Sequence, residues 1–296
     1  MKSATQDANY QWIKNGYGQK VLVNPHDYIG RKMMRYGFFD HMGLYYIEKI
    51  LASLSNPIVF DVGANIGNHS LIMSRLSKMV YLFEPQKHIV ELLQSVQDHN
   101  QIANWKIFNV GLSNETCQIS LYQNKDGNNG KTTFVPELKS LEYSIEPMQV
   151  YRGDEIIKNE NLPHVDFIKI DVEGLEAEVI AGLQQTITTF RPILMVEWNN
   201  EYTKLKFAEY DLFNQLFSDY VTKAIVDRGH YSNWYKKSLK WRQFFSRKKI
   251  KKENWMIEEF HKEFDYEHIL FIPKEKMLTV MPVCSPDEMF FNFIRG

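Results

Sequence analysis

The stretch that decides the fold is VFDVGANIGNHS, residues Val59–Ser70. An apolar run ends in Asp61, and the loop Gly63-Ala64-Asn65-Ile66-Gly67 then opens a helix. Glycines let a backbone approach a ligand closely, and the start of a helix presents N–H groups that have no partner inside the helix. The Gly-x-x-x-Gly spacing differs from the Gly-x-Gly-x-x-Gly that binds a pyrophosphate, and no P-loop Lys-Ser/Thr follows. The loop therefore predicts a nucleoside-containing cofactor other than NAD or FAD.

An acidic residue ends the next apolar run. In FEPQ, Phe83–Gln86, Glu84 lies 17 positions after Gly67. A carboxylate at this place can accept hydrogen bonds from both hydroxyls of a ribose. The loop and the acid together favour nucleoside binding over two unrelated turns.

Short apolar runs alternate with amphipathic stretches, which predicts a parallel sheet with helices on both faces and right-handed crossovers. The polar segment 117–150, with a turn at Asp126–Gly130, predicts a short hairpin or loop near the sheet edge. Ser285-Pro286-Asp287-Glu288 predicts the start of a further helix. The expected strands are 58–62, 79–83, 105–110, 165–170, 193–197, 220–226 and 268–272, and the expected helices are 68–77, 86–100, 175–190 and 205–217.

The composition is that of an ordinary globular protein, with 44% hydrophobic and 24% charged residues, and it excludes a disordered or fibrous chain. Cys117 and Cys284 are the two cysteines, too few for a disulfide framework or a multi-cysteine zinc site. The N-terminus lacks the apolar core of a signal peptide, and no run is long enough to span a bilayer. We therefore expect a cytoplasmic protein.

Positive charge is concentrated in one segment. Lys236–Lys252 contains nine Lys or Arg residues and no acid, although the net charge of the chain is −1. Three interpretations stay open: a solvated helix with Trp241, Phe244 and Phe245 packed inward, peripheral contact with the anionic inner face of a membrane, and binding to RNA phosphates. The solvated helix is the usual outcome for such a charge run.

Beyond these motifs, the chain resembles the FkbM family of S-adenosylmethionine-dependent methyltransferases. The resemblance rests on DVGANIGNHS (61–70), FEPQ (83–86), IKIDVEGLEAEVIAGL (168–183) and PILMVEWN (192–199), in that order and spacing. It covers about half of the chain and is fairly specific, because IKIDVEG is unusual among methyltransferases. The resemblance implies a Rossmann-like class I methyltransferase fold with a seven-stranded, mostly parallel sheet, and S-adenosylmethionine as the cofactor.

The resemblance also implies the positions of the cofactor and the class of acceptor. The family is associated with O-methylation, often of sugars, so the expected acceptor is a sugar hydroxyl or another small polar molecule. The methionine and sulfonium end of the cofactor would lie near Asp61, Gly63, Ala64, Asn65 and Gly67, the ribose near Glu84, and the adenine near Asn109–Leu112, Gly111 included. Asn68, Pro85 and Asp171 are further expected cofactor-binding residues.

Carboxylates at the ends of the fourth and fifth strands are the candidate catalytic groups, because ligands bind outside the carboxyl ends of parallel strands. Asp171 and Glu173 could converge on one site, with one oriented toward the cofactor or acceptor and the other acting as base, or they could together hold a divalent metal. Alternatively, Glu173 caps the following helix. Glu197 either joins this site or pairs with a neighbouring cation.

Two histidines and a lysine are further candidates. His69 in the loop helix and His230 after the sixth strand could each act as base, although a surface or packing role is commoner for a histidine. Alternation along the strand points Lys169 away from Ile168 and Ile170, which predicts helix packing or an ion pair.

We expect residues 1–50 to form a helical or irregular extension, residues 51–275 the methyltransferase domain with a basic insert at 228–265, and residues 276–296 a C-terminal extension. A nucleic-acid methyltransferase is the rival enzyme class. It is disfavoured because the Asn/Asp-Pro-Pro-Tyr and Pro-Cys signatures are absent and the chain is not basic overall. A cofactor-binding protein without catalytic activity is the rival outside catalysis. The sequence does not determine the oligomeric state.

Overall fold

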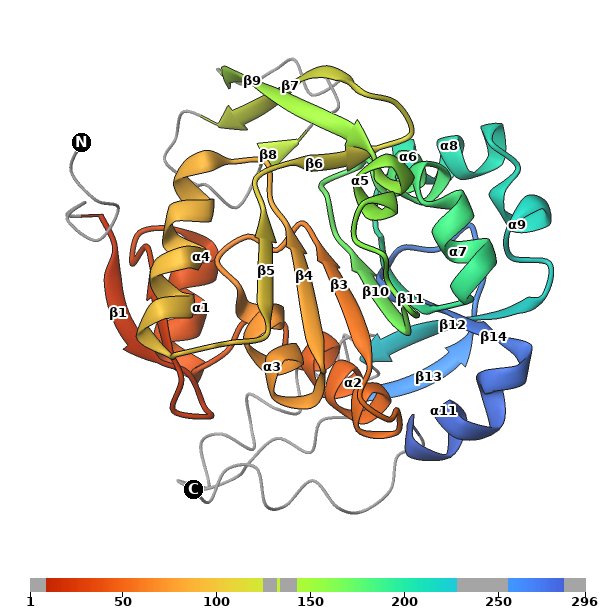
Figure 1. The fold of residues 1–296 in the computed structure, drawn as a ribbon, viewed down its shortest axis with the longest axis horizontal. Coiled ribbons are helices and arrows are strands. Elements are labelled where there is room, and N and C mark those ends of the chain that lie inside the picture. The colour runs from red at the N-terminus through yellow and green to blue at the C-terminus, as the bar shows by residue number, and fades with distance from the viewer. Residues whose placement is uncertain (1–8, 125–131, 134–142, 228–254, 285–296) are drawn as a thin grey trace, which may run out of the picture.

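The computed structural model describes residues 9–124, 132–133, 143–227 and 255–284. Its centre is an eight-stranded sheet with the order β13-β12-β14-β11-β10-β3-β4-β5 (Figure 1). The parallel part consists of β3 (Ile58–Val62), β4 (Met79–Phe83), β5 (Trp105–Phe108), β10 (Phe167–Ile170) and β11 (Ile193–Trp198). Antiparallel pairing then adds β14 (Tyr266–Pro273), β12 (Tyr220–Asp227) and β13 (Trp255–Glu259).

The seven expected strands are all present, and β13 is an eighth. It lies in the segment 228–265, which we expected to be an insert, and it pairs with β12 at the edge of the sheet. Trp255 and Ile257 pack against one core cluster and Met256 against the other, so the side chains of β13 alternate across the sheet. The predicted Rossmann-like α/β fold is confirmed, with one strand more than the sequence indicated.

Helices cover both faces of the sheet. One core cluster joins the sheet to α2 (His41–Ala52), α3 (Asn68–Leu76), α4 (Lys87–His99) and α11 (Met277–Cys284). The other joins it to α5 (Gly153–Lys158), α6 (Glu176–Gly182), α7 (Gln184–Phe190), α8 (Glu201–Glu209) and α9 (Leu212–Gln215). A short 3₁₀ helix, η2 (Lys274–Lys276), leads into α11.

Alternation along the strands also sets where buried polar groups lie. Phe167 packs in the α2 and α3 cluster, whereas Ile168 and Ile170 pack in the opposite one. The same two-residue period places Lys169 on the side of α2 and α3. Asp61 of β3 and His268 of β14 share this side, because Val59 and Leu270 belong to the same cluster. Several buried polar side chains therefore gather beneath the helices on one face.

The helices expected at 175–190 and 205–217 are each divided into two. The first divides between α6 and α7, next to Gly182, where a Cβ atom would stand 1.9 Å from the carbonyl oxygen of Ser113. Asp211 separates α8 from α9, and its φ of 49° is in the left-handed region, which does not continue a right-handed helix. Apolar periodicity alone does not detect such interruptions.

A second, four-stranded sheet follows β5. It contains β6 (Gly111–Ser113), β7 (Cys117–Asn124), β8 (Thr132–Thr133) and β9 (Tyr143–Arg152), in the order β6-β9-β7-β8. β7 and β9 form an antiparallel hairpin, as expected for 117–150, but this hairpin is long and belongs to a separate sheet. The turn predicted at Asp126–Gly130 lies outside the described residues.

The segment ahead of β3 contributes to the core. β1 (Gln11–Lys14) and β2 (Lys20–Val23) form an antiparallel ribbon, and the three apolar residues of β2 are buried. The helix α1 (Tyr28–Tyr36) follows, with Asp27 accepting a hydrogen bond from the Gly30 amide at its start. Residues 10–23 are thus partly strand, which the expectation of a helical or irregular extension did not include.

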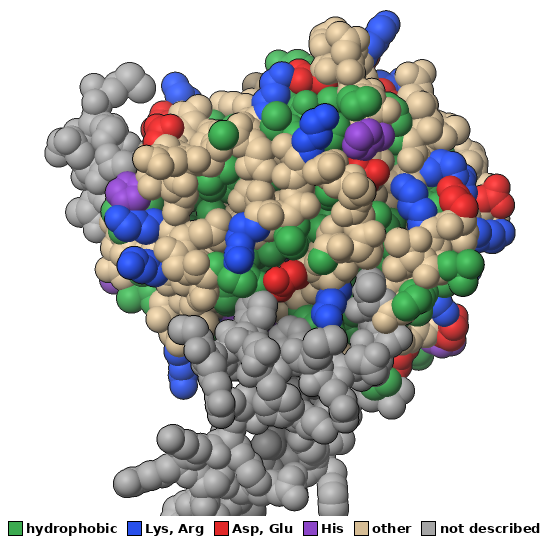
Figure 2. Space-filling model, turned by 60° about the horizontal axis from the view of Figure 1, so that its bottom comes forward, with side chains coloured by type: hydrophobic (Ala, Val, Ile, Leu, Met, Phe, Trp, Pro, Cys, Tyr) green, Lys and Arg blue, Asp and Glu red, His purple; other side chains and the backbone are tan. Residues whose placement is uncertain are grey.

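Within the described residues, no helix is both long and apolar enough to cross a membrane. On the face shown in Figure 2, basic side chains are distributed over the surface, with acidic side chains between several of them. The basic segment Lys236–Lys252 and the helix start at Ser285 lie outside the described residues, so both stay predictions.

Candidate active site

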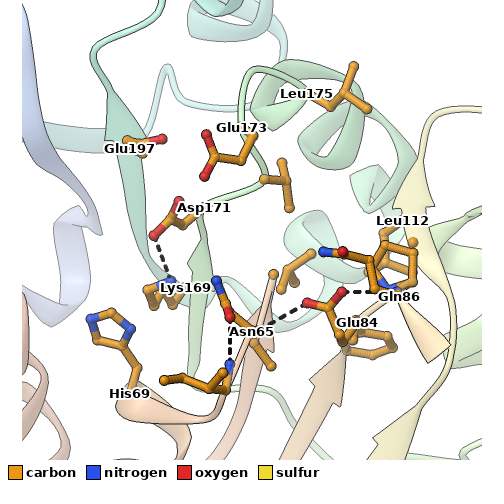
Figure 3. Close-up of a pocket in the computed structure, with 18 of the residues that line it drawn as sticks. Asn65, His69, Glu84, Gln86, Leu112, Lys169, Asp171, Glu173, Leu175 and Glu197 are labelled. Carbon is orange, nitrogen blue, oxygen red and sulfur yellow. Dashed lines mark hydrogen bonds and ion pairs between the residues drawn. The ribbon is translucent and has the colours of Figure 1, made fainter. Parts of the chain in front are cut away.

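A cavity of about 340 Å³ opens at the carboxyl ends of β3, β4 and β10. Its walls come from the loop after β3, the turn after β4, the segment 171–175 after β10, and the start of α1 (Figure 3). This volume lies within the range of small-molecule sites, which is about 300–1,000 Å³. Lys169 lines it. So do twelve of the predicted site residues: Gly63, Ala64, Asn65, Asn68, His69, Glu84, Pro85, Gly111, Leu112, Asp171, Glu173 and Glu197.

The loop after β3 is packed directly against the end of β10. Gly63 has a φ of 80°, and a Cβ atom on it would stand 1.9 Å from the carbonyl oxygen of Asp171. Its amide and that of Ala64 both donate to the carbonyl of Phe83 at the end of β4. Glycine is required here both by the backbone conformation and by the close contact. The loop thereby ties three strand ends together.

Glu84 faces the cavity from the end of β4 and is 3% exposed. Its Oε2 accepts a hydrogen bond from the Asn65 amide and its Oε1 accepts one from the Gln86 amide, each at 3.0 Å. Burial raises the pKa of Glu84 to about 7, against the opposing effect of these two backbone hydrogen bonds. The Gln86 side chain also hydrogen-bonds to this carboxylate. Because a carboxylate has about four acceptor sites, Glu84 can still accept from a ligand.

Three predicted cofactor residues lie behind the lining of the cavity. Asp61 is fully buried beneath the loop, where its Oδ2 accepts a hydrogen bond from the Ser70 hydroxyl at 2.5 Å. Gly67 begins α3 with a φ of 85°. Asn109 donates to the carbonyls of Glu84 and Pro85. These residues shape the walls and do not touch the cavity.

The carboxylates after β10 and in β11 differ in charge state. Burial alone would raise the pKa of Asp171, but the ammonium of Lys169, 3.1 Å away, outweighs it and holds the pKa below its usual value. Burial and the neighbouring Asp171 raise the pKa of Glu197 to about 10. Loss of solvation and Asp171 also raise the pKa of Glu173, although this residue is exposed. At neutral pH the site therefore combines ionised Asp171 with Glu197, which favours its protonated form.

Glu173 is not the cap of the helix that follows it. The Oε1 atom of Glu176 accepts hydrogen bonds from the amides of Val172 and Gly174, and its Oε2 accepts one from the Thr203 hydroxyl. Glu173 itself lines the cavity with a φ of 58°. Glu176 thus holds the segment in a strained conformation that keeps Glu173 in the cavity.

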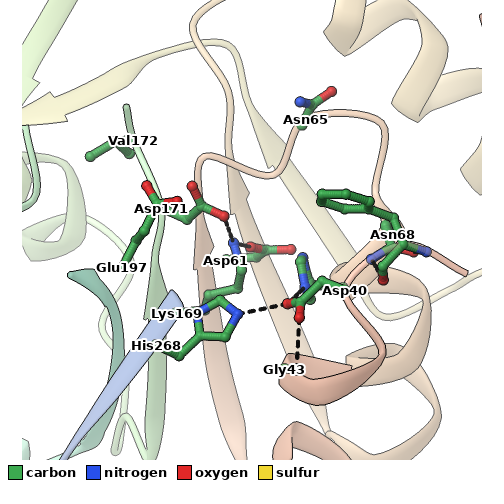
Figure 4. A network of polar contacts seen from close by, with 12 residues as sticks. Asp40, Gly43, Asp61, Asn65, Asn68, Lys169, Asp171, Val172, Glu197 and His268 are labelled. Carbon is green, nitrogen blue, oxygen red and sulfur yellow. Dashed lines mark hydrogen bonds and ion pairs between the residues drawn. The ribbon is translucent and has the colours of Figure 1, made fainter. Parts of the chain in front are cut away.

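A buried polar network forms the floor of the site (Figure 4). Lys169 is 1% exposed and lies between Asp171 and Asp61, with its Nζ 3.1 Å and 3.7 Å from their carboxylate oxygens. Burial opposes its charge, but these two carboxylates raise the pKa of Lys169. The ion pair expected for Lys169 is therefore present, and it places a fixed positive charge beside Asp171.

The same network contains two residues that sequence reasoning missed, Asp40 and His268. The Oδ2 atom of Asp40 accepts hydrogen bonds from Nε2 of His69, at 2.8 Å, and from Nε2 of His268, at 2.7 Å. Its Oδ1 accepts one from the Gly43 amide at the start of α2. The position of Asp40 ahead of an apolar helix predicts a cap, but nothing in the sequence pairs it with His268, 228 positions away.

Among the described residues, one group of three His, Asp or Glu side chains has its donor atoms within 4.8 Å of one another, and that group is Asp40, Glu267 and His268. Asp171 and Glu173 are not part of that group, and a divalent metal held by this pair stays a prediction. His230, the other predicted base, lies outside the described residues.

A parallel sheet with a glycine loop after its first strand and an acid after the second defines a Rossmann-like nucleoside-cofactor domain. Residues 61–224 match the family model described as the methyltransferase FkbM domain. This match covers more than half of the chain, and the chain belongs to the FkbM methyltransferase family.

Curated relatives match this same region. The chain is 28% identical over 140 residues to the hexuronic acid methyltransferase AglP of Haloferax volcanii, covering 47% of this chain and 55% of that protein. It is 23% identical over 150 residues to the 2-O-methyltransferase NoeI of Sinorhizobium fredii, covering 46% and 61%. The chain thus spans less than two thirds of the length of these relatives. The solved structure of methyltransferase FkbM from Methylobacillus flagellatus has a TM-score of 0.42 and 19% identity, covering 73% of this chain and 43% of that one.

Proposed function

We propose that this protein transfers the methyl group of S-adenosylmethionine to a hydroxyl of a sugar or another small polar acceptor. The observation that carries the proposal is the division of one cavity into two chemically different sides. Figure 3 shows Glu84 and Asn65 on one side and Asp171, Glu173 and Glu197 on the other. The first side suits a nucleoside, and the second suits a polar molecule placed next to it.

The residues of the first side fit S-adenosylmethionine. The Glu84 carboxylate has acceptor capacity left for a hydrogen bond from a ribose hydroxyl. At Gly63 a side chain would collide with β10, so the loop is shaped to leave its backbone beside the ligand. Gly111 and Leu112, with Leu121 and Val150 of the second sheet, supply an apolar surface for a base. When bound, the cofactor would supply an electrophilic methyl group on a positively charged sulfur.

The second side offers both donors and acceptors of hydrogen bonds. Glu197 favours its protonated form at neutral pH, so it can donate to a hydroxyl, whereas ionised Asp171 can only accept. Such a mixture suits an acceptor with several hydroxyl groups. The names of the two curated relatives, which act on a hexuronic acid and at a 2-O position, support a sugar. Placing that acceptor beside the methyl carbon would supply much of the catalysis.

Calorimetry with S-adenosylhomocysteine tests the cofactor side. Glu84→Ala removes a charged hydrogen-bond acceptor, each such bond being worth about 1.5–3 kcal/mol, so we expect binding to weaken about 10- to 100-fold. Asp98→Asn is the matched control, because Asp98 is exposed near the end of α4 and does not line the cavity. Absence of heat with the wild-type chain would overturn the proposal.

A tritium-methyl transfer assay with pools of glycans, small molecules and RNA tests the acceptor class. We expect label in the glycan or small-molecule pool. Label in the RNA pool alone would make the protein a nucleic-acid methyltransferase, and cofactor binding without transfer to any pool would make it a binding protein without catalytic activity.

We also propose that Lys236–Lys252 brings the site to an anionic membrane surface that carries the acceptor. Its nine basic residues without an acid support this proposal. Sedimentation with anionic and neutral liposomes at low and moderate salt tests it. Binding that does not depend on anionic lipid would contradict it.

A further inference from the structure

His69, on the floor of the cavity, is not among the residues that the proposed function assigns to cofactor binding. His69 is the second residue of α3 and is 7% exposed, yet it lines the cavity. In Figure 3 it lies on the side of Lys169 and Asp171, away from Glu84. We propose that His69 is the catalytic base that takes the proton of the acceptor hydroxyl and that Asp40 is its positioning residue. This inference rests on the proposed function.

The hydrogen bonds of His69 leave one ring nitrogen available. Nε2 is committed to Asp40 at 2.8 Å, and Nδ1 makes no hydrogen bond with any residue that the structure describes. Burial alone would raise the pKa of Asp40, but His268 and His69 outweigh it and hold the pKa well below its usual value. An ionised Asp40 can only accept, so Nε2 must carry the proton. Nδ1 of the neutral ring then has the lone pair that a base needs.

Asp40 is held in place by three donors. Besides the two imidazoles, the Gly43 amide donates to it at 2.9 Å. Its backbone has a φ of 51° and immediately precedes α2, which packs against α3. Gly43 leaves the room that this arrangement needs, because a Cβ atom there would stand 2.0 Å from the Asp40 carboxylate and 2.8 Å from His268. The orientation of the His69 ring is thus fixed from outside the cavity, as expected of an oriented base.

Charged groups lie around His69 in the same network. Asp40 accepts hydrogen bonds from His69 and from His268. Burial alone would lower the pKa of His268, but Asp40 outweighs it and raises the pKa. Asp61 and Asp171 pair with Lys169 beside them. The Asp40 carboxylate can therefore stabilise the positive charge that develops on the His69 ring when it accepts a proton.

The other candidates are poorer bases at neutral pH. Glu197, with its pKa at about 10, mostly carries its proton already, and the pKa of Glu173 is also raised above its usual value. Asp171 is ionised, but Lys169 stabilises that charge and weakens its basicity. This comparison favours His69 over the carboxylates that the sequence suggested.

The acceptor oxygen uses a lone pair to form a bond to the methyl carbon, and the bond between carbon and sulfur breaks with its electron pair remaining on sulfur. The hydroxyl proton passes to Nδ1 of His69, and the resulting imidazolium is stabilised by Asp40. Proton transfer by a positioned group contributes about 10²- to 10⁴-fold to such rates.

Three variants test the proposal with the acceptor pool that the wild-type chain labels. His69→Gln should lower kcat by about 10²-fold or more, with binding of S-adenosylhomocysteine within about 3-fold of wild type, because the ring contributes to chemistry and not to affinity. His69→Ala should regain activity when imidazole is added. His88→Gln is the control, because His88 is exposed on α4 and outside the cavity lining, and it should change neither quantity.

A readout besides activity is the tautomer of His69. Long-range ¹H–¹⁵N correlation on the full chain, assigned with His69→Gln, should show a neutral ring protonated at Nε2. Asp40→Asn should shift this tautomer balance and lower kcat, while thermal melting shows that the chain is folded. A ring protonated at Nδ1 in the wild-type chain would overturn the proposal, and so would a loss of S-adenosylhomocysteine affinity as large as the loss of activity in His69→Gln.

Different results would refute the proposed function and the assignment of His69. If the wild-type chain labels no pool, the proposed function fails and the assignment of His69 fails with it. If the wild-type chain transfers the methyl group and His69→Gln keeps a kcat close to the wild-type value, the assignment of His69 fails and the proposed function stands.

Discussion

The ammonium of Lys169 lies 3.1 Å from a carboxylate oxygen of Asp171, in a position where the lysine side chain is 1% exposed. Lys169 also neutralises Asp61, whose Oδ1 has no hydrogen-bond partner. One buried cation therefore pairs with the buried carboxylate of Asp61 and with the partly exposed carboxylate of Asp171, which lines the cavity. Removing one member of such a group is costly, because an unpaired buried charge remains.

Lys169→Met should consequently lower the free energy of unfolding by about 3–5 kcal/mol. Urea denaturation followed by fluorescence measures this loss. Lys106→Met is the control, because Lys106 is about half exposed and pairs with Glu160 at the surface, where such pairs contribute less than about 1 kcal/mol. The double variant Lys169→Met with Asp171→Asn should recover part of the loss. Equal effects of the two single variants would contradict the role of Lys169.

Sequence patterns predicted the parts of the site that depend on strand ends. The apolar runs located β3, β4 and β10, and the carboxyl ends of parallel strands lie at one edge of a sheet. Glu84 and Asp171 could therefore be placed near each other without a structure. Alternation also indicated that Lys169 points away from Ile168.

The residues that were missed depend on contacts distant in the chain. Asp40 and His268 meet because α2 and β14 pack on the same face, and their own local sequences specify only a helix cap and a strand. The division of the helix between α6 and α7 likewise depends on Gly182 approaching Ser113 of another element. Local periodicity carries no information about such partners.

Two glycines with similar φ angles allow the cost of a left-handed conformation to be measured separately from the cost of a steric clash. Gly63 has a φ of 80° and Gly18 has a φ of 78°. A Cβ atom at Gly63 would clash with the carbonyl oxygen of Asp171, whereas a Cβ atom at Gly18 would have no neighbour within 4 Å. Gly18→Ala should lower the free energy of unfolding by about 1–2 kcal/mol, because alanine is disfavoured in the left-handed conformation. Gly63→Ala should lower the free energy of unfolding by at least about 2 kcal/mol more than Gly18→Ala does. It should also weaken binding of S-adenosylhomocysteine. Urea denaturation of both variants measures their stability, and calorimetry measures their affinity for S-adenosylhomocysteine. Equal losses of stability in the two variants would show that the loop tolerates a side chain at Gly63.

The affinity for S-adenosylhomocysteine should depend on pH through Glu84. The pKa of this carboxyl is raised to about 7 by burial, so it is half protonated at neutral pH. The ionised form is the better acceptor for ribose hydroxyls. Affinity should therefore rise between pH 6 and 8, by up to about 10-fold per pH unit below the pKa. Calorimetry across this range tests the prediction, and the dependence should disappear in Glu84→Ala.

Stability without ligand should change in the opposite direction with pH. The carboxyl of Glu197 has its pKa raised to about 10, first by burial and then by Asp171. In the unfolded chain the same group ionises near its ordinary value, so above that value the folded state binds more protons. The free energy of unfolding should consequently fall as pH rises from about 5 to 9, and each group of this kind contributes up to about 1 kcal/mol per pH unit.

Glu197→Gln isolates this contribution, because glutamine cannot ionise and its carbonyl oxygen can still accept the hydrogen bond from Asn199. The variant should match the wild-type chain near pH 5 and exceed it in stability near pH 9. Urea denaturation at several pH values measures both slopes, with Asp98→Asn as the exposed control. Parallel slopes for Glu197→Gln and wild type would mean that Glu197 is ionised in the folded chain. Glu197 would then accept hydrogen bonds from the acceptor instead of donating them.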